Sequence, residues 1–441
     1  MHERDIDRRT FVRSTGATAG ALALAGCAGF GADDSDENGA DDSTGDDELP
    51  TPAFPEVEDP PDAVYLPTHR ESMRVLEPVE AGDYTLAPML SYPHPFWLVT
   101  GSGGEDGVQR VDPEQSGGVH LMFVVWDEET NVVLPVDTGA EIAVSLDGER
   151  VGSPQSAWPM ISQEMGFHFG DNVPLEEEGT YAIEVEIPPL SVRTTGDLEG
   201  RFTESATATF EFEYDREFML EVTDGVEYLD EAEWGEPGAL EPMAHGAHAD
   251  DEHGDGDGDD GDHDHDGDGH GDEHDHGDHD HHAAIPYSAL PPAEAYPGTH
   301  LEPVDDSNES SSRDDGGPEA DDLPRSGDAA FVATLLESDS RLADGEDYYV
   351  LVSPRTPYNR VPLADMSLRA AVERDGETVT DDATLEQTID GEYDLHYGTS
   401  LADVRSGDSV AIQIESPPQV ARHQGYETAF LEMPPIELRV P

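Results

Sequence analysis

The chain has 441 residues and a formal net charge of −80, and all 21 of its basic residues are arginine. A surface this acidic argues against nucleic acid or an anionic membrane surface as a partner. High salt would be needed to screen its self-repulsion, so we interpret most of the acidity as halophilic adaptation. Apolar residues make up only 35% of the chain, which predicts modest domains separated by disordered acidic segments.

The N-terminus has the features of an export signal. Arg8 and Arg9 precede a short stretch of small apolar residues that ends at Cys27, the only cysteine of the chain. Twin arginines before such a stretch are typical of a Tat-type signal, and the stretch is too short to span a bilayer. The sequence LAGC resembles a lipobox, although a plain signal with an incidental cysteine is the alternative. We predict a signal with a lipobox over residues 1–27, export, and lipid anchoring at Cys27 to the outer face of the cytoplasmic membrane.

Composition divides the chain between the predicted signal and residue 327 into three segments. Residues 28–60 are acidic and rich in Gly, Ser and Pro, which predicts a disordered tether. Residues 61–222 contain short alternating runs such as TYAIEVEIPP and SATATFEFEYD, separated by Gly, Asp and Pro. This pattern predicts an all-β domain, an immunoglobulin-like β-sandwich without a long amphipathic helix. Residues 223–326 are rich in His and Asp and then in Ser and Asp, and we expect a disordered linker there.

The last part, residues 327–441, repeats the motif order of the first domain. GDYTLAPMLSY matches GDAAFVATLLE, and NVVLPVDTGAEIAVSLDGERV matches NRVPLADMSLRAAVERDGETV. Both parts also contain a His-aromatic-Gly triplet, HFG and HYG, followed by a strand-like run that ends in Pro-Pro. This order predicts a tandem duplication of one β-sandwich. The alternative is two generic sandwiches with similar turns, and the shared triplet argues against it.

Histidine and methionine side chains gather in the first repeat. His120 and Met122 are two residues apart on a predicted strand, so both point to the same face. Met160, Met165 and His168 come just before the next strand. Nitrogen with soft sulfur suits copper, particularly Cu(I), and histidine with a carboxylate suits Cu(II), Zn(II) or Fe(II). Taken singly, each methionine could be core filler and each histidine a structural residue.

These residues carry a resemblance to a known family. Met, then His-aromatic-Gly with Asn close behind, then GTY and a strand ending in Pro-Pro, is similar to the periplasmic ferrous-iron transport protein family. The resemblance implies an immunoglobulin-like sandwich, usually dimeric, that binds copper and supports iron uptake with a membrane permease. It offers His120, Met160 and His168 as ligands, while Met122 stands where the family often has an acid. The spacing from Met160 to His168 is one residue longer than the family pattern, so Met165 stays a candidate.

The family has a further histidine shortly after Pro-Pro, and the first repeat lacks it. The second repeat supplies His423 there, but it has no counterpart of His120 and no Met before His396. This suggests an intramolecular pseudo-dimer whose one asymmetric site is completed by His423. A distance above about 10 Å between His423 and His168 would contradict this hypothesis, because metal–nitrogen bonds are about 2.0–2.1 Å. The alternative is a purely structural second repeat. Four further candidate ligands lie in Pro-rich settings that we expect to be loops: His69, Met73, Met89 and His94.

A histidine-rich tract lies inside the predicted linker. Its eleven histidines are His245, His248, His253, His263, His265, His270, His274, His276, His279, His281 and His282, out of 19 in the chain. A halophilic linker needs Asp and Gly but has no use for His, so we predict a metal-loading tract. Imidazoles interleaved with carboxylates offer many weak sites for Zn(II), Cu(II), Ni(II) or Fe(II), and they do not specify the metal.

These features favour a cell-surface lipoprotein that binds copper and/or ferrous iron, with zinc a further candidate, and delivers it to a membrane permease. The alternative is a tandem immunoglobulin-like surface module for structure or adhesion, with a cation-buffering linker. We expect no enzymatic activity, because the sequence has no P-loop, no Gly-x-Ser-x-Gly elbow and no HExxH motif.

Overall fold

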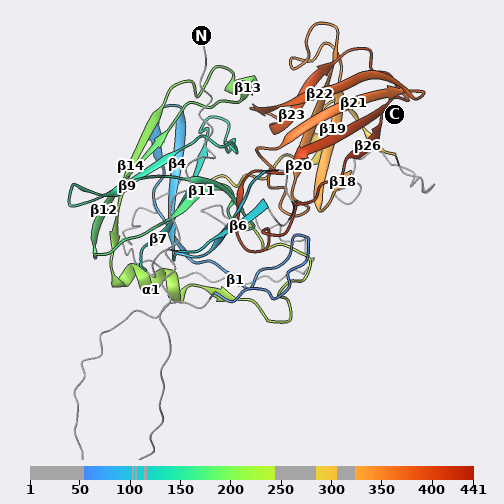
Figure 1. Ribbon diagram of the computed structural model, residues 1–441. Coiled ribbons are helices and arrows are strands. Elements are labelled where there is room, and N and C mark those ends of the chain that lie inside the picture. Colours follow the sequence, from blue (N-terminus) through green and yellow to red (C-terminus); the bar gives the residue numbers. More distant parts are fainter. Residues whose placement is uncertain (1–53, 102–103, 105–106, 114–116, 244–284, 305–322) are drawn as a thin grey trace, which may run out of the picture. The chain divides into compact units, whose positions relative to one another are not determined.

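The computed structural model describes residues 54–101, 104, 107–113, 117–243, 285–304 and 323–441, all within the unit Leu49–Pro441 (Figure 1). The predicted export signal with Arg8, Arg9 and Cys27 lies outside these residues, as does the predicted tract with its eleven histidines. No helix in the described part of the chain is long and apolar enough to cross a membrane.

The first repeat is a sandwich of two antiparallel sheets, as predicted (Figure 1). One sheet contains, in order, β4 (Tyr84–Ser91), β7 (Val119–Trp126), β11 (Gly166–Val173) and β10 (Trp158–Ser162). The other contains β14 (Ala206–Tyr214), β12 (Gly179–Ile187), β8 (Glu141–Leu146) and β9 (Glu149–Ser156). Strand β14 alternates buried and exposed residues along its length, which is the pattern of a strand with one face in the core and one in water.

The second repeat has the same strand order. Its strands are β19 (Ala329–Leu336), β20 (Tyr348–Arg355), β23 (Asp394–Leu401), β22 (Glu377–Asp390), β21 (Ser367–Arg374), β24 (Ser409–Ser416) and β26 (Ile436–Arg439). The long strand β22 pairs with β21 through its first half and with β23 through its second half, where the first repeat uses β9 and β10. The described residues are therefore all-β sandwiches, and the matching order agrees with the predicted duplication.

The two repeats exchange short strands. After Pro-Pro in the second repeat, β25 (Ala421–Arg422) pairs in parallel with β10 of the first repeat. After Pro-Pro in the first repeat, β13 (Arg193–Thr195) pairs in parallel with β22 of the second. Each repeat thus adds a strand to the edge of a sheet of the other, and residues that follow β25 are carried onto the first repeat.

Shorter elements extend these sheets. The sheet of β10 continues through β25 to β5 (Phe96–Val99) and β6 (Val108–Val111), while β2 (Met73–Val75) and β3 (Val79–Ala81) pair with β4. Near the second repeat are β18 (Arg325–Ser326) and the short 3-10 turn η4 (Ala293–Ala295), and the turn η3 (Gly196–Leu198) follows β13. Every residue of β7 is buried, so both faces of the β4–β7–β11–β10 sheet are covered there.

The predicted disordered linker, residues 223–326, is partly ordered. Helix α1 (Arg216–Asp224) extends into it, and Asp215 caps this helix by accepting a hydrogen bond from the Phe218 amide at 2.8 Å. It also contributes β15 (Glu227–Tyr228), paired with β1 (His69–Arg70), and β16 (Thr299–His300) and β17 (Glu302–Pro303). Isolated apolar residues such as Leu240 and Leu290 are buried there. The sequence did not reveal these contacts, because single apolar residues without periodicity give no strand or helix pattern.

An ion-pair and hydrogen-bond group fixes the exchanged strand β13. Thr195 donates its hydroxyl to Asp390 Oδ2 at 2.5 Å, and Arg341 donates to Asp390 Oδ1 at 2.6 Å. Burial alone would raise the Asp390 pKa, but the hydrogen bonds from Arg341 and Thr195 outweigh it and lower the pKa to about 2. A carboxylate whose pKa is lower in the folded than in the unfolded protein stabilises the fold above its unfolded pKa.

We therefore expect Asp390→Asn to lower the free energy of unfolding at neutral pH by about 2 kcal/mol, the equivalent of the pKa difference. This contribution is present above about pH 4 and is lost as the pH falls toward about 2, so the wild type should lose more stability than the variant over that window. Urea denaturation at a series of pH values measures both effects, with the exposed Asp382→Asn as control. Equal pH slopes for wild type and Asp390→Asn would contradict the assignment.

Candidate metal centre

The candidate ligands of the first repeat lie on the outer face of the β4–β7–β11–β10 sheet. His120 on β7, Met160 on β10 and His168 on β11 are each fully buried. Their chain neighbours Leu121 and Phe167 point the other way, into the core between the sheets. The outer face is therefore a second buried surface, and polar side chains placed on it must find partners there.

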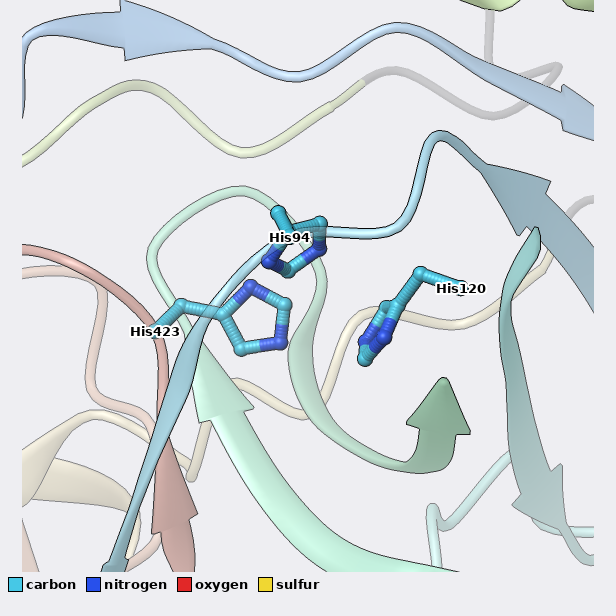
Figure 2. Close-up of side chains that lie close together, drawn as sticks. All are labelled: His94, His120 and His423. Atoms are coloured by element: carbon cyan, nitrogen blue, oxygen red, sulfur yellow. The ribbon is translucent and has the colours of Figure 1, made fainter. Parts of the chain in front are cut away.

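Four imidazoles converge on this face. His168 Nε2 and His423 Nε2 are 3.2 Å apart, and His423 follows directly after the exchanged strand β25. The ligand nitrogens of His94, His120 and His423 all lie within 4.8 Å of one another (Figure 2). The rings of His94 and His120 have their centroids 4.2 Å apart. The structure thus brings His120, Met160, His168 and His423 together, across the two repeats.

A single carboxamide orients two of these histidines. Asn172 Nδ2 donates to the His94 carbonyl at 2.9 Å, and a carbonyl can only accept, so the amide orientation is fixed. Asn172 Oδ1 then faces His120 Nδ1 at 3.1 Å, and this nitrogen must carry the proton. His120 Nε2 is left with its lone pair, buried and without a hydrogen-bond partner among the described residues.

The other three imidazoles are held in the same way. His168 Nδ1 lies 3.1 Å from the Gly166 carbonyl, and His94 Nδ1 lies 3.1 Å from the Pro95 carbonyl. For His423 the acceptor at Nδ1 is Glu71 Oε1, at 3.0 Å. Each of the four histidines therefore has an acceptor at Nδ1, and His168 Nε2 faces His423 Nε2. Metal-binding histidines almost always donate their second ring N–H in this manner.

The closest pair of nitrogens has the spacing of two ligands of one ion. In these tautomers His168 Nε2 and His423 Nε2 are two lone pairs facing each other across 3.2 Å. Two lone pairs at this distance repel unless a proton or a cation lies between them. Two nitrogens bound to one tetrahedral ion at about 2.0–2.1 Å would be about 3.3–3.4 Å apart, close to the separation observed.

Glu71 supplies a negative charge to the cluster. Its Oε2 is 3.2 Å from His94 Nε2, and its Oε1 accepts from His423. Burial works to raise the Glu71 pKa, but the adjacent His94 and His423 outweigh it and hold the pKa well below its usual range. Beside it, Glu164 pairs with Arg70, and burial followed by the Glu71 charge raises the Glu164 pKa to about 7.

The imidazoles themselves are kept mostly neutral. Burial, then the neighbouring His423, lowers the His168 pKa to about 3. Burial also lowers the pKa of His120 well below its usual range and lowers that of His423. Only His94 has a raised pKa: burial opposes this, and the Glu71 carboxylate outweighs burial. At neutral pH the site therefore offers deprotonated nitrogens and a carboxylate, the form in which these groups bind metal ions.

The sulfur ligands predicted from sequence lie in two neighbouring clusters of buried residues. Met160 is the cross-strand partner of His168 and packs with Phe96 and Ala421. Met122 and Met165 belong to an adjacent apolar cluster, which also contains Met89. Met122 is nevertheless beside the imidazoles, because a Cβ at Gly170 would lie 3.2 Å from Met122 Cγ and 3.4 Å from His120 Nε2.

Two members of the cluster were undervalued or missed in the sequence. The sequence offers His94 only as a loop candidate, and the signal that could identify it is its position between Pro93 and Pro95, which restricts the backbone. Glu71 had no distinguishing signal, because it is one of 101 acidic residues. Its role depends on β1 and β2, which are too short to be recognised by periodicity.

The second repeat contains an equivalent position with different residues. His396 on β23 is the counterpart of His168, since both are the histidines of the His-aromatic-Gly triplets. Across the sheet, Thr388 pairs with His396 where Met160 pairs with His168. The thioether of the first repeat is thus replaced by a hydroxyl.

The strand registers identify two more replacements. Tyr349 pairs with the residue four positions after the triplet histidine, as His120 does in the first repeat. Thr195 lies two positions after the residue of β13 that pairs with Thr388, as His423 does relative to β25. Three of the four equivalent positions therefore carry no imidazole or thioether.

Tyr349 lies beside His396 at the position that His120 has in the first repeat. Its hydroxyl is 3.5 Å from His396 Nε2 and 2.2 Å from the position of a Cβ at Gly398, so only glycine fits there. Burial lowers the His396 pKa to about 4. Among the described residues, the second repeat has a closed structural version of the site, and the first repeat has the convergent one.

The chain is similar to one protein family over part of its length and to solved structures at low TM-scores. A family model described as "Domain of unknown function (DUF7350)" matches residues 294–439. That range is about a third of the chain. No curated protein matches the sequence. Among solved structures, the chain is similar to a copper-bound variant of FetP from uropathogenic Escherichia coli strain F11, at 21% identity and a TM-score of 0.23. The likeness covers 32% of this chain and 97% of that one. The same protein as isolated matches at 18% identity and a TM-score of 0.22, covering 32% and 96%.

The hydrogen bonds of Asn172 predict the tautomer of one histidine. In the metal-free protein His120 should carry its proton on Nδ1, because Asn172 Oδ1 accepts it. Two-bond proton–nitrogen NMR spectra distinguish the two tautomers, with the His120 signals assigned by their loss in His120→Gln. Asn172→Leu should allow the Nε2–H tautomer to appear, while Asn131→Gly at an exposed turn should leave the spectrum unchanged. An Nε2–H tautomer in the wild type would contradict the assignment.

Proposed function

We propose that the protein is an exported, lipid-anchored, non-enzymatic protein that binds a transition metal and supports its uptake by delivery to a membrane permease. The observation that carries the metal-binding part is the arrangement of His94, His120, His168 and His423. All four have an acceptor at Nδ1, His168 Nε2 faces His423 Nε2, and the ligand nitrogens of His94, His120 and His423 lie within 4.8 Å of one another. Buried imidazoles so arranged would be costly in a purely structural protein, since one Nε2 is unpartnered and two oppose each other.

The donor set favours copper, with ferrous iron and zinc as the competing ions. Several neutral imidazoles with one thioether, Met160, suit copper in either oxidation state. The Glu71 carboxylate adds a harder donor, which suits Cu(II), Zn(II) and Fe(II). The net charge contributed by the buried ligands is one negative charge, so a bound cation would be compensated within the site.

The proposed uptake role rests on two sequence features, the N-terminal signal and the histidine-rich tract. The signal with Arg8, Arg9 and Cys27 would place the protein at the outer face of the membrane, where a permease is accessible. The histidine-rich tract would collect ions from outside and raise their concentration near the metal centre. The alternative, a structural surface module, needs neither the convergent imidazoles nor the tract.

Metal titration of the full-length chain tests the proposal directly. All eleven tract histidines are first replaced by glutamine, so that the tract keeps its length but loses its imidazoles. We expect one tight equivalent of Cu(II), and a comparison with Fe(II) and Zn(II) in high salt ranks the ions. His168→Ala should remove this equivalent, because it takes away one of the converging nitrogens.

His396→Ala is the matched control. It removes the equivalent buried histidine of the second repeat and creates a similar cavity, yet it should leave the tight equivalent in place. If both variants lose binding, the effect is structural. If neither does, the metal centre is not at the imidazole cluster and the surface-module alternative gains support.

The pKa shifts also predict the pH dependence of binding. Because His120, His168 and His423 have lowered pKa values, they need not release protons when an ion binds near neutral pH. Only the proton favoured on His94 by Glu71 has to leave. Between about pH 5.5 and 7.5, the apparent association constant should fall by no more than about tenfold per pH unit of acidification. Competition titrations measure this slope, and a steeper fall would show that more ligands are protonated than the structure implies.

A further inference from the structure

A small cavity lies against the outer side of the metal centre. It has a volume of about 40 Å³, and its lining includes Glu71 and His423, the pair that closes the imidazole cluster on this side. A space of this size holds one water molecule or a few at most, and equally a cation that has lost most of its hydration shell.

The other walls carry ligand atoms that the imidazole cluster does not use. Met73 and Met165 line the cavity with His69. His69 Nδ1 is 2.9 Å from Thr68 Oγ1, which leaves Nε2 as the nitrogen that could bind an ion. Met73 and Met165 lie at the border of the apolar cluster of Met89 and Met122, so the cavity has an apolar, sulfur-containing side and a carboxylate side.

These walls select for a particular kind of ion. The lining also includes Ser162, Gln163, Glu164 and Gln424, whose side-chain oxygens already have partners: the Met165, Leu240 and Thr68 amides bond to Ser162, Gln163 and Gln424, and Arg70 pairs with Glu164. A strongly hydrated divalent cation would therefore find few available oxygen ligands to replace its water. A soft monovalent ion such as Cu(I) prefers thioether and imidazole donors and gives up its water readily. The adjacent Glu71 carboxylate, which is shared with the imidazole cluster, would balance its charge.

We propose that this cavity is a second cation site, specific for a soft monovalent ion of the Cu(I) type, with Met73, Met165 and His69 as ligands. The proposal rests on the metal-binding function assigned to the imidazole cluster, which lies on the other side of Glu71. The chain would then bind two ions in different environments, one rich in nitrogen and one containing two thioethers.

Silver(I) is the probe, because it is soft, monovalent and not oxidised during the measurement. The full-length chain with the eleven tract histidines changed to glutamine is titrated with Ag(I) by calorimetry, and bound ions are counted by native mass spectrometry. We expect two tight equivalents. Met73→Leu with Met165→Leu should lose one of them, since leucine keeps the volume of methionine but has no sulfur.

Two controls distinguish failure of the cavity site from failure of the imidazole cluster. Met219→Leu changes a buried methionine on helix α1 and should keep both equivalents. His168→Ala should remove the cluster equivalent and leave the cavity equivalent. The cavity site alone would be overturned if the double methionine variant still bound two equivalents of Ag(I). It would also be overturned if the parent bound a single equivalent and His168→Ala abolished it. Retention of both equivalents in His168→Ala would instead count against the imidazole cluster, and thermal melts of each variant exclude unfolding as the cause.

Discussion

The parallel pairing of β25 with β10 is the contact on which the metal centre depends. It places Ala421 beside Met160 and Arg422 beside Ile161, and the amide of His423 then donates to the Ile161 carbonyl at 3.2 Å. The Arg422 guanidinium is fully buried and donates to the carbonyls of Tyr426 and Ala429, which secures the segment after the strand. Because a strand register is set in whole residues, a slip of one position would turn the His423 side chain to the other face.

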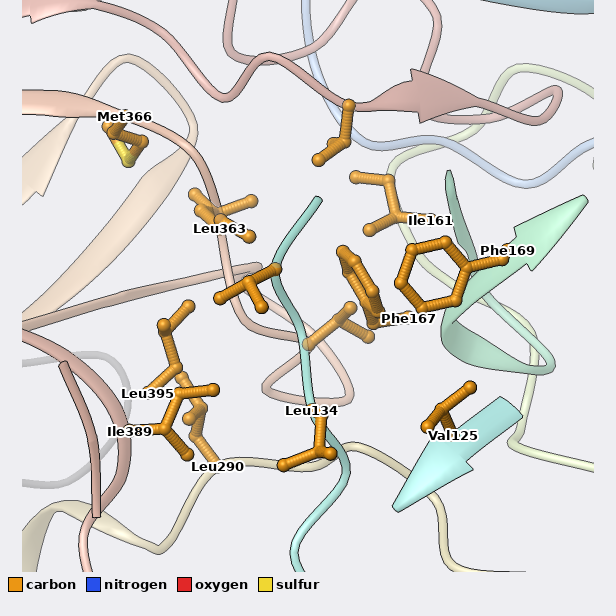
Figure 3. Close-up of a cluster of buried hydrophobic side chains, with 14 of the residues drawn as sticks. Val125, Leu134, Ile161, Phe167, Phe169, Leu290, Leu363, Met366, Ile389 and Leu395 are labelled. Atoms are coloured by element: carbon orange, nitrogen blue, oxygen red, sulfur yellow. The ribbon is translucent and has the colours of Figure 1, made fainter. Parts of the chain in front are cut away.

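This pairing is supported by a hydrophobic core that includes both repeats. Ile161, Phe167 and Leu134 of the first repeat belong to one buried cluster with Leu363 and Leu395 of the second (Figure 3). Burial of apolar area contributes about 25 cal/mol per Å², so this shared core stabilises the contact between the repeats. The apolar surface thus fixes the positions of the repeats, and the polar cluster is built at the edge of it.

The sequence was sufficient for the parts of the structure that follow simple periodicity. Alternating runs predicted the sandwiches, and the motif order predicted that the second repeat would supply His423. Sequence reasoning could not separate Met160 from Met122 and Met165, because all three are apolar residues near a histidine, and only the strand register shows which one faces His168. The sequence pattern also predicted a disordered linker that includes residues 223–243 and 285–304, because the buried apolar residues of these segments stand alone in the sequence. Glu71 depends on a long-range contact that no local pattern encodes.

The differences between Tyr349 and His120, and between Thr388 and Met160, have a consequence for the evolution of the chain. In a dimer of identical subunits, any substitution at the interface appears twice, so both sites would lose the same ligand. Here the two halves are one covalent chain, and each half can change independently. The linkage also gives His423 a fixed, high effective concentration at the first repeat, so completion of the site does not depend on how dilute the protein is. Each copy of the chain therefore carries both halves of the site and needs no second chain to complete it.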